Sequence, residues 1–139
     1  MKRGFLALAC VAVVVALSCT YGLKEPYYAE VTEIGFCRDW DDAEQKPRDI
    51  SETFSADTRR IYLFAYAKTK EKLYFTVDWY HSGRYFLQQT VAQNGEGYIR
   101  TWIDAPAAGF AEGSYRITLF LGKTEFGEAT FWVEKSITK

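Results

Sequence analysis

From residue 60 onward, apolar and polar side chains alternate along the chain with a period of two. Successive side chains of a β-strand point to opposite faces, so this alternation is typical of strands that bury one face. The pattern predicts strands at 60–67, 72–81, 84–92, 98–104, 114–121 and 126–134, and an earlier strand at roughly 30–37. No segment shows sustained helical periodicity, so the chain is predicted to be all-β.

The alternation also predicts which side chains face the core. Val77 and Trp79 share a face of one strand, and Ile117 and Leu119 share a face of another. We therefore expect Trp79 to be buried between two sheets, close to the other three residues. The remaining sets predicted to share a face are Ile61, Leu63, Ala65 and Ala67; Tyr85, Leu87 and Val91; Ile99, Thr101 and Ile103; and Ala129, Phe131 and Val133.

Turn residues separate these strands at short and fairly even spacing, which is typical of a β-sandwich. Glycine and asparagine tolerate the positive φ angles that tight hairpin turns require. The polar stretch 38–58 contains Pro47 and shows no alternation. The predicted fold is thus a single antiparallel β-sandwich of about 7–8 strands over residues 29–139. The turn pairs are Ser82 and Gly83, Asn94 and Gly95, and Gly122 and Lys123.

Length and charge narrow the class of protein. The chain has 139 residues, enough for one domain with a proper core. It carries 17 basic and 18 acidic side chains and a single histidine. Nucleic-acid binding requires a basic face, so this balance gives no reason to expect a nucleic-acid partner.

The first 18 residues have the pattern of an export signal. Lys2 and Arg3 precede an apolar run at 5–17, which is shorter than the roughly 20 residues that cross a bilayer. We expect a signal peptide at 1–18, a tether at 19–28 and the sandwich domain at 29–139. Removal of the signal changes the net charge from −1 to −3.

The end of this signal can be cut in two ways. Ala16 and Ser18 satisfy the small-residue rule of the ordinary signal peptidase. The same stretch, followed by Cys19, resembles a bacterial lipobox, although Ala16 stands where leucine is usual. We expect lipidation of Cys19, with the membrane as partner and a periplasmic or outer-membrane location. The alternative is an ordinary periplasmic or secreted protein.

After removal of the expected signal peptide, Cys19 and Cys37 remain, and two alternatives are open for Cys37. If Cys19 is acylated, Cys37 is an unpaired thiol that behaves as a small buried hydrophobe. If Cys19 is free, an oxidising compartment allows a bridge between the two. No cysteine and histidine spacing suggests zinc, and we expect neither a metal nor a cofactor.

Two local motifs resemble immunoglobulin-like domains. Residues 77–83 resemble the third strand of such domains, with Trp79 pointing inward before a glycine turn. Residues 112–117 resemble the start of the penultimate strand, where the hydroxyl of a tyrosine, here Tyr115, bonds to nearby backbone at a corner. Ile117 and Ala65 stand near the positions of the usual inter-sheet cysteines, so the resemblance is to cysteine-free immunoglobulin-like or fibronectin-like modules.

A broader resemblance is to uncharacterised bacterial envelope modules of immunoglobulin-like shape. Such modules have no established chemistry, so the resemblance implies no catalytic residues. It rests on the order of short elements: Phe36 and Cys37, Pro47, Phe54, Ile61 and Tyr62, Trp79, residues 100–102, Pro106, Gly109 and Phe110, Gly113 and Tyr115, and Phe131 and Val133.

Candidate catalytic residues are few. His81 lies beside a turn and is expected to be a strand-end residue with a local hydrogen bond. The chain contains no nucleophile elbow, zinc-protease motif or phosphate-binding loop. A small hydrolase would need Asp78 or Asp104 as one of two carboxylates in a cleft. We predict that the protein is not an enzyme.

The stretch 39–44 concentrates acidic side chains. Calcium takes six to eight oxygen ligands, so this density is one candidate site for it. The stretch lacks the glycine-centred spacing of an EF-hand loop, and Trp40 interrupts it. The two interpretations are a solvated acidic loop and a calcium loop, and we favour the former.

Aromatic residues make up 17% of the chain, and two interpretations are open. Either tyrosines alternate with polar residues on an outer sheet face simply because they favour strands, which is the interpretation we favour, or they form a binding face. Exposed, coplanar rings would form a flat platform for a sugar ring or a protein. The leading hypothesis is a non-catalytic, lipid-anchored envelope module that binds a protein partner or supports an assembly. The alternative is a secreted glycan-binding module that uses these rings. The candidate binding residues are Tyr62, Tyr66, Tyr74, Tyr80 and Trp102.

Overall fold

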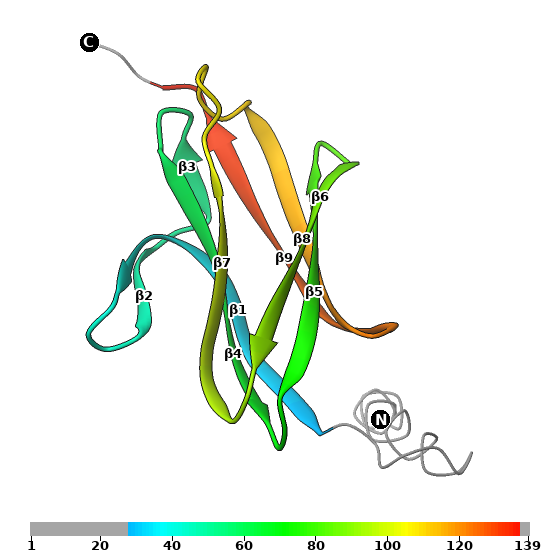
Figure 1. Cartoon of the computed structure of the whole chain (residues 1–139). Helices are drawn as coiled ribbons and strands as arrows, with labels where there is room; N and C mark the ends of the chain where they lie inside the picture. The colour runs from blue at the N-terminus through cyan, green and yellow to red at the C-terminus, as the bar shows by residue number, and fades with distance from the viewer. Residues whose placement is uncertain (1–27, 137–139) are drawn as a thin grey trace, which may run out of the picture.

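The computed structural model describes residues 28–136 and shows an all-β sandwich (Figure 1). A four-stranded sheet has the order β2-β1-β4-β7, and a five-stranded sheet has the order β3-β9-β8-β5-β6. All neighbouring strands are antiparallel except β3 and β9. The strands are β1 (Ala29–Asp41), β2 (Lys46–Ile50), β3 (Thr53–Ser55), β4 (Arg60–Thr69), β5 (Leu73–His81), β6 (Arg84–Gln93), β7 (Glu96–Asp104), β8 (Gly113–Leu121) and β9 (Thr124–Glu134).

The two ends of the sandwich carry different parts of the chain. Strand β1 begins where Ala29 pairs with Thr69, at the end that also holds the β6–β7 turn (Figure 1). The opposite end holds the β5–β6 turn, the β7–β8 connection and the end of β9. The expected signal peptide and Cys19 lie outside the described residues. No helix in the described part of the chain has the length and apolar character that a membrane span requires.

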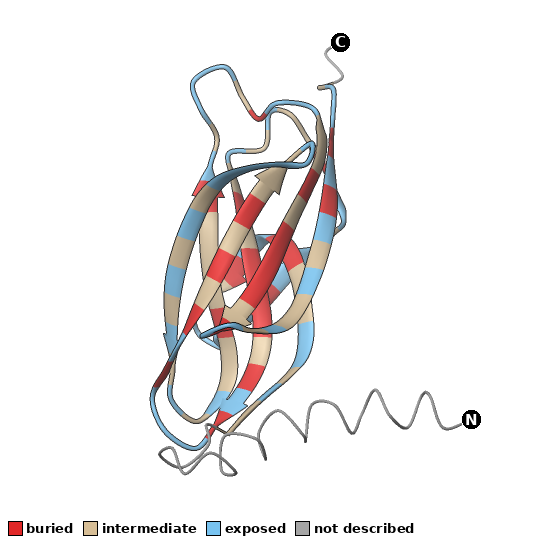
Figure 2. Cartoon of the chain, turned by 90° about the vertical axis from the view of Figure 1, so that its right-hand side faces the viewer, coloured by how far each residue is buried: buried red, intermediate tan, exposed pale blue. Residues whose placement is uncertain are grey.

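The core lies between the sheets, and most of its inner positions are those that the alternation predicts. Figure 2 shows buried and exposed positions alternating along the strands. Trp79 is fully buried; it pairs across the ladder with Ile117, and Val77 pairs with Leu119. The predicted burial of Trp79 between the sheets is therefore confirmed. The predicted all-β sandwich is confirmed as well.

The polar stretch 38–58 contains structure that the sequence pattern does not reveal. Strand β1 runs on to Asp41, and the short strands β2 and β3 follow it. These strands have five and three residues, too few to show a period-two pattern. Phe54 nevertheless anchors β3 in the core, where its ring meets that of Phe131 edge-on at 5.3 Å.

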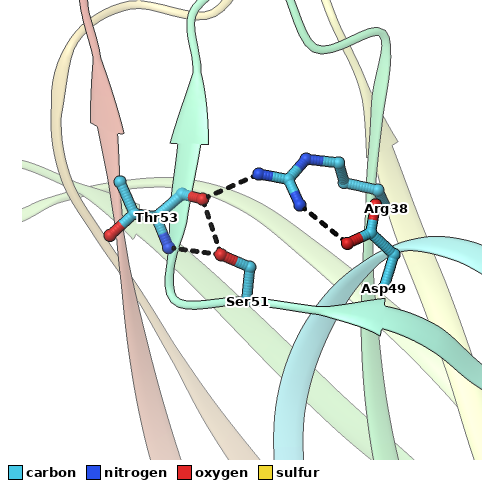
Figure 3. Close-up of polar contacts among 4 residues, drawn as sticks. All are labelled: Arg38, Asp49, Ser51 and Thr53. Carbon is cyan, nitrogen blue, oxygen red and sulfur yellow. Dashed lines mark hydrogen bonds and ion pairs between the residues drawn. The ribbon is translucent and has the colours of Figure 1, made fainter.

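Figure 3 shows how Arg38 stabilises the crossing between β2 and β3. Its Nη1 donates to Asp49 Oδ1 at 3.0 Å, and its Nη2 donates to the Thr53 carbonyl at 3.1 Å. Ser51 also binds Thr53, donating through Oγ to its carbonyl at 2.7 Å. Asp49 has a φ of 59°, a left-handed conformation that aspartate tolerates better than most residues. We interpret this polar cluster as structural, because its groups bond to one another where the chain changes sheet.

One predicted face is wrong because strand β6 contains a bulge. Tyr85 was expected beside Leu87 and Val91 on the inner face, but it is 56% exposed and pairs with Tyr80. The register of the β5–β6 ladder shifts between Trp79 and Tyr80. An extra residue in one strand reverses the direction of the side chains beyond it.

Two glutamines of β6 connect the sheets along the side of the sandwich where β6 faces β7. Gln89 accepts a hydrogen bond from Trp79 Nε1 at 2.7 Å and donates to the Trp102 carbonyl at 2.9 Å. Gln93 donates to the Ala67 carbonyl at 3.1 Å. These side chains supply hydrogen-bond partners for backbone carbonyls of the four-stranded sheet.

Tyr115 forms the expected corner. Its hydroxyl donates to the Ala111 carbonyl at 2.8 Å, and its ring stacks on Phe131 at 4.8 Å. Burial raises the pKa of this hydroxyl. Gly113 precedes it with a φ of +124°, and a Cβ there would lie 3.0 Å from Ser82 Oγ. The glycine thus permits both the turn and the close approach of the β5–β6 hairpin.

We expect Tyr115→Phe to lower the free energy of unfolding by about 0.5–1.5 kcal/mol, the net contribution of one hydrogen bond. Urea unfolding of wild type and variant measures the change. Tyr85→Phe is the matched control, because Tyr85 is exposed and should tolerate loss of its hydroxyl. Unchanged stability of Tyr115→Phe together with weaker partner binding would instead make this corner a contact surface.

Candidate functional site

The five candidate binding residues do not lie on one face. Tyr62 and Tyr66 in β4, and Trp102 in β7, belong to the four-stranded sheet. Tyr74 and Tyr80 in β5 belong to the five-stranded sheet on the other side of the core. The structure therefore separates the predicted face into two, because β4 and β5 are consecutive in sequence but lie in different sheets.

On the outer face of the four-stranded sheet, aromatic rings alternate with arginines. The Arg60 guanidinium lies 4.7 Å from the centre of the Trp102 ring. Arg100 lies 5.0 Å from the Trp40 ring and 5.8 Å from the Tyr62 ring. Each arginine also has a carboxylate partner, Asp104 for Arg60 and Asp42 for Arg100. The cations are therefore held between rings and carboxylates of the same face.

This arrangement does not provide a flat platform. The Tyr62 and Trp102 rings meet at 66°, and the Tyr66 and Tyr98 rings meet at 82°. Sugar rings stack on exposed aromatic faces, whereas here arginines cover Tyr62 and Trp102. The coplanar rings that would favour glycan binding are thus not formed by these residues.

The tyrosine hydroxyls of the same face bind carboxylates. Tyr66 donates to Glu96 at 2.8 Å, and this hydrogen bond raises the pKa of Tyr66. Tyr98 donates to Glu33 at 3.0 Å. The pKa of Tyr98 is raised mainly by burial and, to a smaller extent, by this hydrogen bond. Both donors already have a protein acceptor, which reduces what the face can offer to a ligand.

The outer face of the five-stranded sheet carries more dispersed aromatic residues. Tyr80 is covered by Arg116, whose guanidinium lies 4.0 Å from the ring centre. Tyr80 and Tyr85 meet at 68°. Tyr74 is exposed near the other end of β5, with Lys72 5.6 Å from its ring. The Tyr80 and Tyr85 rings are therefore not coplanar either.

The candidate catalytic residues are engaged in separate local contacts. His81 Nε2 lies 2.8 Å from the Glu112 carbonyl, the local strand-end bond that the sequence predicts. Asp78 accepts from Gln88 at 2.8 Å in the five-stranded sheet. Asp104 forms an ion pair with Arg60 in the four-stranded sheet. Asp78 and Asp104 are on different sheets and do not form the carboxylate pair that a glycosidase-like hydrolase requires.

The acidic loop uses its carboxylates to shape the β1–β2 hairpin. Asp41 Oδ1 accepts from the backbone N–H groups of Ala43 and Glu44, both at 3.0 Å. Asp39 pairs with Arg48, whose hydrogen bond lowers the pKa of Asp39. Within residues 28–136, no three acidic, histidine or cysteine side chains come together as a metal site. The geometry is that of an exposed hairpin turn.

Cys37 is buried beside Trp40 and Phe64, in a second small cluster outside the main core. It has no disulfide partner among the described residues. Burial raises the pKa of its thiol to about 11. At neutral pH the thiol is therefore protonated and behaves as a small hydrophobe, which makes it a poor nucleophile.

An apolar groove lies at the end of the sandwich opposite the start of β1. The groove has a volume of about 910 Å³ and runs between the first residues of β6 and the 105–111 segment. Phe86 at its rim is 46% exposed, and Phe110 and Tyr115 line it from the other side. Phe86 and its neighbour Tyr85 are two of the five exposed large apolar residues in the described part of the chain, and they are adjacent in sequence. We take this groove and the adjacent β6 edge as the candidate functional site.

Sequence reasoning did not identify this groove. Its lining comes from β5, β6, β7, the 105–111 segment and β8, several of which are distant in sequence. The sequence offers two signals: the run of uncharged apolar residues at 85–87, which the alternation assigns partly to the core, and the connection at 106–113, where a contact surface with Phe110 and Tyr115 is the alternative to a structural corner. The bulge in β6 brings that run to the surface.

Comparison with known proteins supports the fold. No protein-family model matches the chain, and no curated protein matches it in sequence. The crystal structure of an immunoglobulin-like protein from Pseudomonas aeruginosa superposes with a TM-score of 0.55 and 14% identity, over 77% of this chain and 97% of that chain. The CARDB domain of a Pyrococcus furiosus protein, solved in complex with di-metal ions, gives 0.48 and 15% over 81% and 96%. The chain has an immunoglobulin-like fold.

Proposed function

We propose that this protein is a non-catalytic binding module of the bacterial envelope, held at a membrane by lipid on Cys19 and acting through a protein partner. The immunoglobulin-like fold is consistent with a non-catalytic module. The placement of the start of β1 and the groove at opposite ends of the sandwich is the observation that most directly supports an anchored protein that binds a partner. Strand β1 starts ten residues after Cys19, at the end opposite the apolar groove.

This arrangement suits a protein that is anchored to a membrane at one end and binds its partner at the other. The start of β1 and the β7–β8 connection lie at opposite ends of the sandwich (Figure 1), so a chain tethered before Ala29 presents the groove away from the point of attachment. The exposed apolar side chains Tyr85 and Phe86 gather at that end. Exposed apolar residues beside a hollow are typical of protein-binding sites. A protein partner also fits better than a glycan, because the aromatic face lacks coplanar rings.

The anchor predicts that Cys19→Ala abolishes palmitate labelling and detergent partitioning, with the precursor retained. A diacylated cysteine gives stable membrane attachment, whereas a single acyl chain gives only marginal binding. Metabolic labelling and phase separation measure both properties in cells. Cys37→Ala is the matched control and should keep the label. Continued processing of Cys19→Ala, with wild type in the aqueous phase, would show that the ordinary peptidase cut is used.

The partner is tested by cross-linking and capture from native envelope, read by mass spectrometry. Digesting the envelope extract with protease before capture should abolish binding if the partner is a protein. Capture that survives protease but is lost after glycan digestion would replace the proposal with glycan binding. Absence of any reproducible partner would contradict a binding function.

A further inference from the structure

The sandwich has four edge strands, and three of them are protected against pairing with another strand. Strand β2 carries three charged residues and Pro47 within five positions. Strand β3 has only three residues. Strand β7 contains charged residues, and its Trp102 and Gly97 carbonyls accept from glutamines of β6. Charge, proline, short length and coverage are the usual ways in which proteins prevent edge pairing.

Strand β6 is less protected: its one charge is Arg84 at its first position, it has no proline, and it is not short. It runs for ten residues at the edge of the five-stranded sheet. Residues 85–93 contain no charge, no proline and no glycine, and several of them favour strands. An edge of this length and composition readily pairs with an added strand. The contrast with the other three edges indicates that this one is open for pairing.

The apolar groove begins at the N-terminal end of the same edge. Phe86 and Leu87 line it from β6, and Phe110 lines it from the opposite side. A strand that pairs with β6 therefore passes directly over the hollow. In strand addition, backbone hydrogen bonds supply affinity, and pockets for individual side chains supply specificity. The groove offers room for one bulky apolar side chain of the added strand.

Charge at this end specifies the occupant further. Arg84 begins β6, lies on the groove and forms no ion pair with the described residues. A carboxylate in the added strand would complement it. A second copy of β6 fits poorly, because β6 has no acidic residue to face Arg84. If two copies of β6 paired antiparallel, the C-terminal end of one copy would lie at the groove of the other. That end, residues 90–93, has no large side chain to fill the groove.

We infer that β6 binds an extended segment of the protein partner as an added strand, with a bulky apolar side chain in the groove and an acidic residue facing Arg84. This inference rests on the proposed partner-binding function and assigns its surface. Three observations carry it together: the unprotected edge, the apolar groove at one end of that edge, and the lone cation beside the groove.

The test selects dodecapeptides from a randomised displayed library on the full mature protein in detergent. We expect the selected peptides to be strand-forming, with an aromatic or large aliphatic residue and a nearby acidic residue. Their binding should slow hydrogen exchange of β6 amides. Arg84→Glu and Phe86→Ala should each weaken affinity about tenfold or more, as loss of a central contact does.

Matched controls separate this surface from the rest of the molecule. Lys123→Glu reverses a charge at the exposed β8–β9 turn, and Trp132→Ala removes an exposed ring on β9. Neither variant should change peptide affinity by more than about twofold. Equal weakening by the controls, or exchange protection confined to other strands, would overturn the inference.

Proline substitutions test the backbone pairing itself. Neighbouring residues of an edge strand direct their N–H groups to opposite sides, so one of Thr90→Pro and Val91→Pro preserves the β5–β6 ladder. The variant of the two that remains folded should lose peptide binding. Normal binding by that variant would overturn the inference even if the other variant unfolds.

The remaining outcomes separate this inference from the proposed function. Dimers in sedimentation, with β6 amides protected without peptide, would replace the partner strand with a second copy. Capture of an envelope protein that Arg84→Glu and Phe86→Ala leave unchanged would keep the binding function and reject β6 as its surface. Failure of all capture would contradict the binding function itself.

Discussion

Trp79→Ala is expected to lower the free energy of unfolding by about 3–5 kcal/mol, the usual cost of removing a packed tryptophan. The side chain is fully buried and contacts the Phe36 ring at 6.3 Å between centroids. Its loss leaves a large cavity between the sheets and removes the donor to Gln89. Small domains have only about 5–15 kcal/mol of total stability, so a large share is lost.

Urea or guanidinium unfolding measures this change. Trp132→Ala is the matched control, because Trp132 is 51% exposed on the outer face of β9. We expect that control to change stability by less than about 1 kcal/mol. Equal losses in the two variants would mean that Trp79 does not fill the core and that the inward face of β5 is wrong.

The position of Trp79 shows what the sequence alone can determine. Alternation assigns a side chain to one of two faces, and the burial of one face makes that assignment strong. Val77, Trp79, Ile117 and Leu119 follow this rule without exception. The same rule fails at Tyr85, because a bulge adds one residue and no local residue type announces it.

The candidate site was harder to predict because alternation says nothing about which sheet a strand joins. Tyr66 in β4 and Tyr74 in β5 both face outward, yet they lie on opposite sides of the molecule. Pairing with β1 or with β8 decides between the sheets, and these pairings are distant in sequence. The groove depends on the same long-range pairing, so it could be found only in the folded structure.

The unprotected edge of β6 could be predicted from the sequence only in part. The uncharged run 85–93 is visible in the sequence. Its significance depends on knowing that β6 is an edge strand, because the same composition in a central strand is ordinary. Composition and topology together therefore mark the surface that neither identifies alone.

Substitution of Gln89 is expected to cause the second large loss of stability, because its side chain bonds to both sheets. It accepts from the buried Trp79 indole N–H and donates to the Trp102 carbonyl. Gln89→Leu keeps a similar volume but leaves both groups without their partner. Each unsatisfied buried group costs about 1–3 kcal/mol, so we expect a total loss of about 2–4 kcal/mol.

Gln88→Leu is the matched control for this change, because Gln88 is the neighbouring glutamine but is exposed and bonds only to Asp78. It should alter stability by about 0.5 kcal/mol or less. A double-mutant cycle with Trp79→Phe isolates the indole bond, since phenylalanine has no N–H to leave unpaired. Gln89→Leu should cost at least about 1 kcal/mol less in that background. Equal costs in both backgrounds would show that the bond from the Trp79 indole to Gln89 does not stabilise the sandwich, and that the cost of Gln89→Leu comes from packing and from the bond to the Trp102 carbonyl.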